Sequence, residues 1–143
     1  MKYLKTYEKT ILSNSTMREY SNNIKLIKNI DINSTTYQGR TLLMNTYSLE
    51  ITKYLINNGV DLDKKDDNGS TALIYHAYQA LNYDNLGIVK ELIKAGANWC
   101  VIDNDGDNFF DLLSRKMKMK IKKKFPKQYQ KYLEWQETIK YNI

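Results

Sequence analysis

Three stretches of the sequence share a spacing of ten residues between two turn positions, and this spacing restricts the fold more than any other feature. The pairs are Asn29 with Gly39, Gly59 with Gly69, and Gly96 with Gly106. The first residue of each pair follows an apolar stretch with helical periodicity, and glycine or asparagine commonly ends a helix in the left-handed conformation. The second residue precedes a new apolar stretch. The spacing therefore predicts helices joined by connections of constant length.

The second position of each pair belongs to a tight turn. Asn68-Gly69 is a strong turn signal because both residues tolerate positive φ. Thr71 and an apolar stretch follow at once, and Thr41 stands at the equivalent place after Gly39. We expect each of these segments to form a short hairpin between consecutive helix pairs, with the threonine beginning the next helix.

The repeated pattern resembles the ankyrin repeat. Glycine, any residue, threonine, any residue and leucine are followed by two helices that end in Leu-Ile-x-x-Gly, as at 55–59 and 92–96. The ankyrin unit has about 33 residues, a β-turn and two helices. The likeness covers about residues 16–115. The family's proline and histidine positions hold other residues here: Leu42, Ala72 and Phe109 for proline, and Met44, Ile74 and Asp111 for histidine.

The resemblance implies an all-α solenoid with short β-hairpin turns and about four repeats including capping helices. One domain spans residues 1–143. Its expected parts are an N-terminal capping repeat (1–38), a full repeat (39–68), a repeat with an insertion at 80–85 (69–105), and a basic C-terminal capping repeat and helix (106–143).

The two ends are expected to be helical caps. Thr16 to Glu19 has the pattern of a capping box, which predicts a helix that ends near Lys28, and apolar residues at 3–12 recur at helical spacing. Pro126 interrupts the chain, and a last helix is expected over 127–141. Its inward residues are predicted to be Tyr129, Tyr132, Leu133 and Ile139.

Catalysis and metal binding are disfavoured by the residue inventory. His76 is the only histidine and Cys100 the only cysteine, and their spacing matches no catalytic or metal-binding pattern. Residues 103–107 (DNDGD) resemble half of a calcium loop, but the glycine and the closing glutamate are out of register, so a hairpin tip is the simpler interpretation. The acidic run at 61–67 alternates with lysines and is interpreted as a solvated turn. We expect no enzyme and no cofactor.

The single cysteine excludes an internal disulfide and favours a reducing compartment. The N-terminus becomes polar at once, and no apolar run approaches the length of a membrane span. A cytoplasmic protein without membrane contact, monomeric by default, is predicted. A secreted effector that uses another export route would have the same features.

Charge is distributed unevenly along the chain. From Arg115 onward ten Lys and Arg face two Glu, a net charge of +8, whereas the preceding residues carry −2. This segment suits a capping helix whose Met and Ile residues pack inward, a contact for an acidic protein, or a nucleic-acid or targeting patch with stacking aromatics at Phe125, Tyr129 and Tyr132. Its basic residues are Arg115, Lys116, Lys118, Lys120, Lys122, Lys123 and Lys124.

The family resemblance implies protein binding through the hairpin tips and the concave inner helices, and the small size favours an inhibitor or neutraliser of one target, encoded by a virus or a bacterium, or an immunity protein. Tyr37 and Tyr78 are the expected anchors because aromatic residues dominate interface hot spots. Trp99 is expected to pack beneath residues 80–85. The predicted partner-binding positions are Thr35, Tyr37, Gln38, Arg40, Ser48, Lys65, Asp67, Asn68, Ser70, Tyr78, Gln79, Ile102, Asn104, Asp105 and Asp107.

Overall fold

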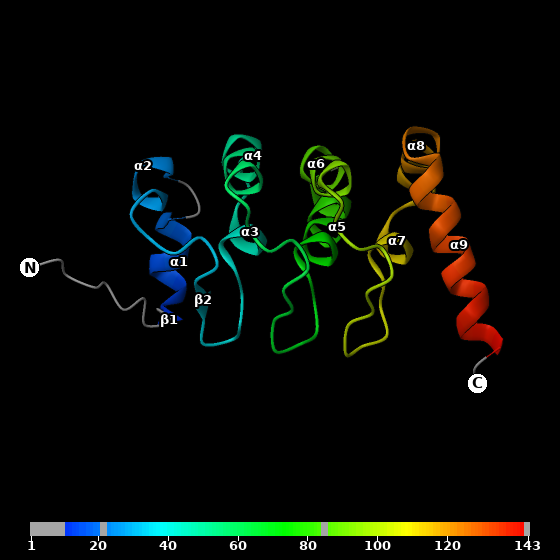
Figure 1. Cartoon of the computed structure of the whole chain (residues 1–143), viewed down its shortest axis with the longest axis horizontal. Coiled ribbons are helices and arrows are strands. Elements are labelled where there is room, and N and C mark those ends of the chain that lie inside the picture. Colours follow the sequence, from blue (N-terminus) through cyan, green and yellow to red (C-terminus); the bar gives the residue numbers. More distant parts are fainter. Residues whose placement is uncertain (1–10, 21–22, 84–85, 142–143) are drawn as a thin grey trace, which may run out of the picture.

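The computed structural model describes residues 11–20, 23–83 and 86–141, and its helices stand in pairs along one row (Figure 1). The elements in chain order are β1 (Ile11–Leu12), α1 (Asn14–Tyr20), α2 (Ile24–Ile27), β2 (Thr35–Thr36), α3 (Leu42–Asn45), α4 (Leu49–Asn57), α5 (Ala72–Tyr83), α6 (Gly87–Ala95), α7 (Phe109–Leu112), α8 (Arg115–Lys124) and α9 (Pro126–Tyr141).

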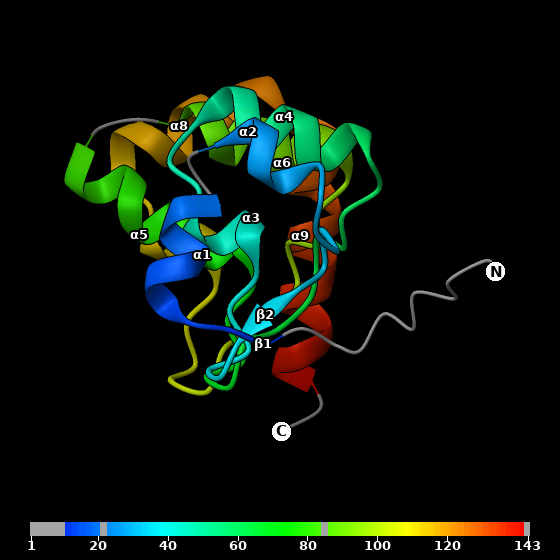
Figure 2. The same cartoon turned by 90° about the vertical axis from the view of Figure 1, so that its left-hand side faces the viewer.

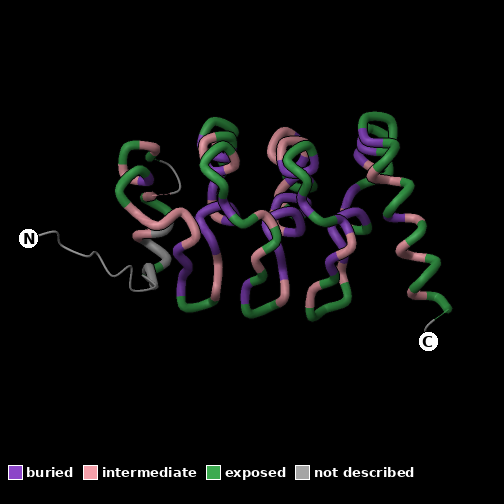
Figure 3. The backbone as a smooth tube through the Cα atoms, viewed as in Figure 1, coloured by how far each residue is buried: buried purple, intermediate pink, exposed green. Residues whose placement is uncertain are grey.

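Each helix pair packs on the next pair rather than around a common centre. The inner helices form one row, in which α1 contacts α3, α3 contacts α5, and α5 contacts α7. In the outer row α4 contacts α6, and α9 packs against α8 at the end of the solenoid. Buried residues recur in every pair (Figure 3), among them Leu42, Leu73, Leu92, Phe109 and Ile121. The predicted all-α solenoid of stacked helix pairs is confirmed.

Three hairpins project from the same side of the row of helices (Figures 1 and 2) and share one backbone geometry. They comprise residues 36–40, 66–70 and 103–107. In each, the N–H of the first residue donates to the carbonyl of the fifth at 3.0 Å, and the glycine N–H donates back to the carbonyl of the first at 3.0–3.2 Å. The turn glycines have φ of 72°, 75° and 86°. The ten-residue spacing therefore marks the same structural unit each time.

Helix ends follow the local signals of the sequence. Gly59 and Gly96 have φ of 78° and 101° after α4 and α6. The hydroxyl of Thr41 accepts the N–H of Met44 at 3.3 Å and caps α3. Thr71 precedes α5 as expected, but among the described residues its buried hydroxyl has no hydrogen-bond partner. Pro126 begins α9 at the helix position where a missing N–H is harmless.

Two predictions for the N-terminal cap are wrong. The expected single helix from Thr16 to Lys28 is divided in two, because the side chain of Asn23 accepts the N–H of Lys25 and starts α2 as a new helix. Thr16 lies inside α1, where its N–H donates to the Ser13 hydroxyl. Residues 11–12, expected to be helical, form β1 and pair in parallel with β2, which leads into the first hairpin. The rest of the expected helix over 3–12 lies outside the described residues.

The inserted segment lengthens a helix. Residues 80–83 continue α5, which has 12 residues, whereas the equivalent inner helix α3 has four. The C-terminal half of α5 therefore extends beyond the end of α3 (Figure 2).

Trp99 has other neighbours than expected. Its ring lies 5.0 Å from that of Phe109, 6.1 Å from Phe110 and 6.3 Å from Tyr132. These rings belong to α7 and α9, and Tyr83, the aromatic residue of the inserted segment, is not among them. Trp99 therefore packs in the aromatic core of the C-terminal cap, and the predicted contact with the inserted segment is not seen at Tyr83; residues 84–85 of that segment lie outside the described residues.

Candidate functional site

The hairpin tips are joined into one continuous strip. The carbonyl of Gln38 accepts the N–H of Asp67 at 3.0 Å, and the carbonyl of Asn68 accepts the N–H of Asn104 at 2.9 Å. A Cβ on Gly39 would lie 3.1 Å from the Cα of Asp66, closer than most Cβ contacts, so a side chain there would push the two tips apart by a few tenths of an ångström. Because the backbones are bonded tip to tip, the three tips are held in fixed relative positions.

The first residue of each hairpin fixes the turn with its side chain. Oδ1 of Asp66 accepts the N–H groups of Asn68 at 3.0 Å and Ser70 at 2.9 Å. Asp103 accepts the equivalent pair from residues 105 and 107 at 3.0 and 2.9 Å. In the first hairpin the hydroxyl oxygen of Thr36 accepts the N–H groups of residues 38 and 40, each at 3.3 Å. Residues 103–107, which resemble half of a calcium loop, thus form a hairpin in which the carboxylate of Asp103 accepts two backbone hydrogen bonds of the turn.

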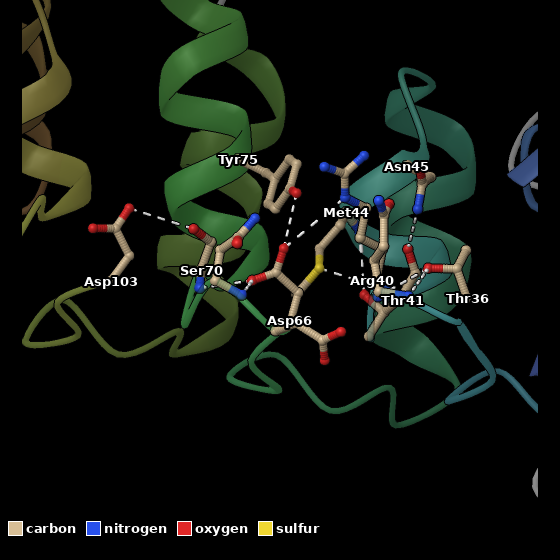
Figure 4. A network of polar contacts seen from close by, with 12 residues as sticks. Thr36, Arg40, Thr41, Met44, Asn45, Asp66, Ser70, Tyr75 and Asp103 are labelled. Atoms are coloured by element: carbon tan, nitrogen blue, oxygen red, sulfur yellow. Dashed lines mark hydrogen bonds and ion pairs between the residues drawn. The ribbon is translucent and has the colours of Figure 1, made fainter. Parts of the chain in front are cut away.

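Asp66 is the centre of a buried polar network (Figure 4). Its side chain is 0% exposed, and Oδ2 accepts the hydroxyl of Tyr75 at 2.9 Å. Nε of Arg40 lies 3.9 Å from the same oxygen, an ion pair without a hydrogen bond, and the guanidinium lies over the Tyr75 ring at 5.3 Å from its centroid. Burial and then the hydrogen bond to Asp66 raise the pKa of Tyr75 to about 12.

This network corrects the interpretation of the acidic run as a solvated turn. Asp61, Asp63 and Asp67 are exposed, but Asp66 is buried. Asp66 and Tyr75 were not among the predicted site residues. The available signal was positional, because Thr36, Asp66 and Asp103 all stand three residues before the turn glycine, where a side-chain acceptor closes the hairpin.

Most of the predicted partner-binding positions line the strip of tips or the adjoining inner helices. Tyr37 is 81% exposed and Ile102 37%. Tyr78 lies on α5 at 41% exposure, and its hydroxyl donates to Oδ2 of Asp107 at 2.9 Å, a bond that raises the pKa of Tyr78 to about 12. Further exposed positions are Gln38, Lys65, Asp67, Asn68, Asn104 and Asp105, and the half-buried ones are Arg40, Ser48, Gln79 and Asp107.

Two predicted positions have buried side chains. Thr35 is 4% exposed because it belongs to β2 and also bridges to Thr41. Ser70 is 8% exposed, and its hydroxyl donates to Oδ2 of Asp103 at 3.4 Å in the next hairpin. Neither side chain is presented to a partner in this structure.

The basic segment is helix α8 with the start of α9. The ammonium groups of Lys118 and Lys122 lie over the Phe110 ring at 5.6 and 5.8 Å from its centroid, and that of Lys122 also lies 4.6 Å from the Tyr129 centroid. The remaining basic residues of α8 are exposed: Arg115, Lys116, Lys120, Lys123 and Lys124.

The idea that aromatics beside the basic residues stack on bases is contradicted. Phe125 and Tyr132 are buried, and Tyr129 is half-buried against Phe110, with the two ring centroids 5.4 Å apart. The aromatic residues of this segment pack inside the C-terminal cap. The lysines of α8 remain as an electrostatic surface without stacking rings.

No helix within the described ranges combines the length and the apolar character that crossing a bilayer needs.

Comparison with known proteins agrees with the geometry. A family model described as ankyrin repeats (3 copies) matches residues 12–103. The chain is also similar to an ankyrin repeat protein, L81, of Acanthamoeba polyphaga mimivirus, with 40% identity over 82 residues. That match covers 51% of this chain and 30% of the viral protein, so the chain spans about a third of the length of this relative.

Proposed function

This chain belongs to the ankyrin repeat family, a non-catalytic fold for protein–protein interaction, and on that premise we propose that it binds and neutralises one target protein through its hairpin tips and inner helices. The observation that carries the proposal is the strip of tips. Because Gln38 bonds to Asp67 and Asn68 to Asn104, the surface is ordered before binding, and a partner does not have to order it.

Tyr37 and Tyr78 support the proposal as anchors. Tyr37 stands almost fully exposed on the first tip, and the Tyr78 ring is held on α5 by its hydroxyl bond to Asp107. Exposed tyrosines contribute large contact areas, and the Tyr78 ring, already held by its bond to Asp107, loses little entropy on binding. The expected contact strip runs from Tyr37 along the tips to Asp105.

The three bonded tips form one strip, which offers one contact surface for a single target. The relative is encoded by a virus. Its origin supports the version of this proposal in which the chain is also encoded by a virus and the target is a host protein. The compartment in which such a target would be met is proposed to be the cytoplasm.

The test is affinity capture of partners from the native host, followed by binding measurements with the captured protein. Tyr37→Ala and Tyr78→Ala are each expected to weaken the complex at least about tenfold, which is about 1.4 kcal/mol. Tyr141→Ala, on the last turn of α9 and 83% exposed, is the matched control and should leave affinity unchanged. Equal affinity for all three variants would refute binding by the tips.

A second candidate function is association with nucleic acid, favoured by the exposed basic residues of α8. Affinity for duplex or single-stranded nucleic acid should then fall steeply with salt, because binding releases counterions from the phosphates. Replacing Lys120, Lys123 and Lys124 by glutamine should abolish it, whereas replacing Lys118, which lies over Phe110, should have a smaller effect. Salt-independent or undetectable binding would remove this candidate.

A further inference from the structure

A cavity of about 470 Å³ opens where the long helix α5 extends beyond the short helix α3. It is lined by Tyr47 from the connection between α3 and α4, by three residues of α5, and by Ile88 of α6. The α5 residues are His76, Gln79 and Tyr83, which share one helix face because they are spaced by three and four residues. The cavity therefore lies between the short connection of residues 46–48 and the lengthened end of α5 in the next repeat.

The cavity wall contains a buried hydrogen-bond acceptor. His76 is 3% exposed, and its Nε2 lies 2.8 Å from the carbonyl oxygen of Leu43. A carbonyl only accepts, so Nε2 carries the proton and Nδ1 of the neutral ring is an acceptor. None of the described residues donates to Nδ1, and His76 is one of the residues that line the cavity. Burial lowers the pKa of His76, so the ring is neutral at neutral pH.

We propose that this cavity receives a tryptophan or tyrosine side chain of the target protein, whose indole N–H or phenol O–H donates to Nδ1 of His76. This inference rests on the proposed protein-binding function and extends its surface. Gln79 lines the cavity and follows Tyr78, the expected anchor on the same helix, so the cavity adjoins the proposed contact surface.

The chemistry of the lining selects this occupant. The described lining residues are uncharged, so a lysine or arginine entering among them would lose hydration without a counter-charge. An ionised carboxylate has only hydrogen-bond acceptors, so it could not donate to Nδ1, which is itself an acceptor. An aliphatic side chain would leave Nδ1 unpaired. An uncharged aromatic ring packs against Tyr47, Tyr83 and Ile88 and also supplies the missing donor.

The direct test is ¹⁵N NMR of the imidazole ring of His76. Because His76 is the only histidine in the sequence, its ring signals cannot be confused with those of another histidine. The full chain, labelled with ¹⁵N, is titrated with N-acetyltryptophanamide. The Nδ1 resonance should shift as that atom accepts a hydrogen bond, and the analogue methylated at the indole nitrogen should produce no such shift. Absence of a shift at about 10 mM probe, where even weak fragments bind, or the same shift with the methylated probe, overturns the proposal.

Variants of exposed wall residues complete the test without disturbing the core. Tyr47 and Tyr83 are 63% and 70% exposed, so Tyr47→Ala and Tyr83→Ala should fold and should each weaken probe binding about tenfold. Tyr141→Ala, on the last turn of α9 and 83% exposed, is the control that leaves probe binding unchanged. Binding that is insensitive to Tyr47→Ala and Tyr83→Ala would place the probe elsewhere and refute the assignment.

The captured target separates this inference from the proposed function. Tyr83→Ala should weaken that complex, and N-acetyltryptophanamide should compete with it. If Tyr37→Ala disrupts the complex while Tyr83→Ala and the probe have no effect, the cavity proposal fails and the proposed function stands. If the probe binds but the complex is insensitive to it, the occupant is a free small molecule and not a side chain of the target.

Discussion

Replacing Asp66 by alanine tests whether the leading side chain of each hairpin stabilises the solenoid. The substitution removes a charged acceptor from the N–H groups of Asn68 and Ser70 and from the hydroxyl of Tyr75. Hydrogen bonds to charged groups contribute about 1.5–3 kcal/mol each. Asn68 is exposed, so its N–H can bond water afterwards, whereas Ser70 is buried and Tyr75 is half-buried beside Arg40 of the preceding hairpin. We therefore expect a loss of about 3–4 kcal/mol.

The equivalent positions supply matched controls of graded strength. Asp103 accepts the same two backbone bonds, but it is half-buried, and the Ser70 hydroxyl approaches it only at 3.4 Å, so Asp103→Ala should cost about 1–2 kcal/mol. Thr36 makes two 3.3 Å bonds with a neutral hydroxyl, and Thr36→Ala should cost about 1 kcal/mol.

The assay is urea unfolding followed by far-ultraviolet circular dichroism at pH 7. The free energy of unfolding is obtained by linear extrapolation, and an unchanged slope shows that the same surface is exposed in each variant. The reasoning fails if Asp66→Ala loses less than about 1 kcal/mol, or if Asp103→Ala loses more than Asp66→Ala, because burial of the acceptor would then have no influence.

Two further outcomes follow from the structure. Gly39→Ala should be more destabilising than Gly106→Ala by roughly 1 kcal/mol, because both have positive φ but only at Gly39 would the Cβ lie 3.1 Å from the backbone of the next hairpin; equal losses in urea unfolding would contradict the close approach. The free energy of unfolding should fall as the pH decreases below 6.5, the ordinary pKa of histidine, because burial lowers the pKa of His76 and the unfolded chain binds the proton more readily. A urea midpoint that is constant from pH 7.5 to 5.5 would show that His76 does not titrate differently in the folded chain.

The repeat architecture was readable from the sequence because its signals are local. A glycine with positive φ, or a side-chain acceptor that closes a turn, acts within a few residues, and the ten-residue spacing records two such positions in every repeat. The hairpins and the final helix after Pro126 could be predicted in this way, whereas the stacking of the helix pairs and the exposed position of Tyr37 were implied by the resemblance to the ankyrin repeat.

Tertiary structure decided what depends on the neighbouring repeat. The burial of Asp66, the aromatic surroundings of Trp99 and the pairing of residues 11–12 with the first hairpin involve contacts across repeats, which no local pattern encodes. The cavity beside His76 arises because an inner helix of 12 residues stands next to one of four. The sequence determined the unit and its number of copies, but the differences in length between adjacent units determined where side chains are buried and where a cavity remains.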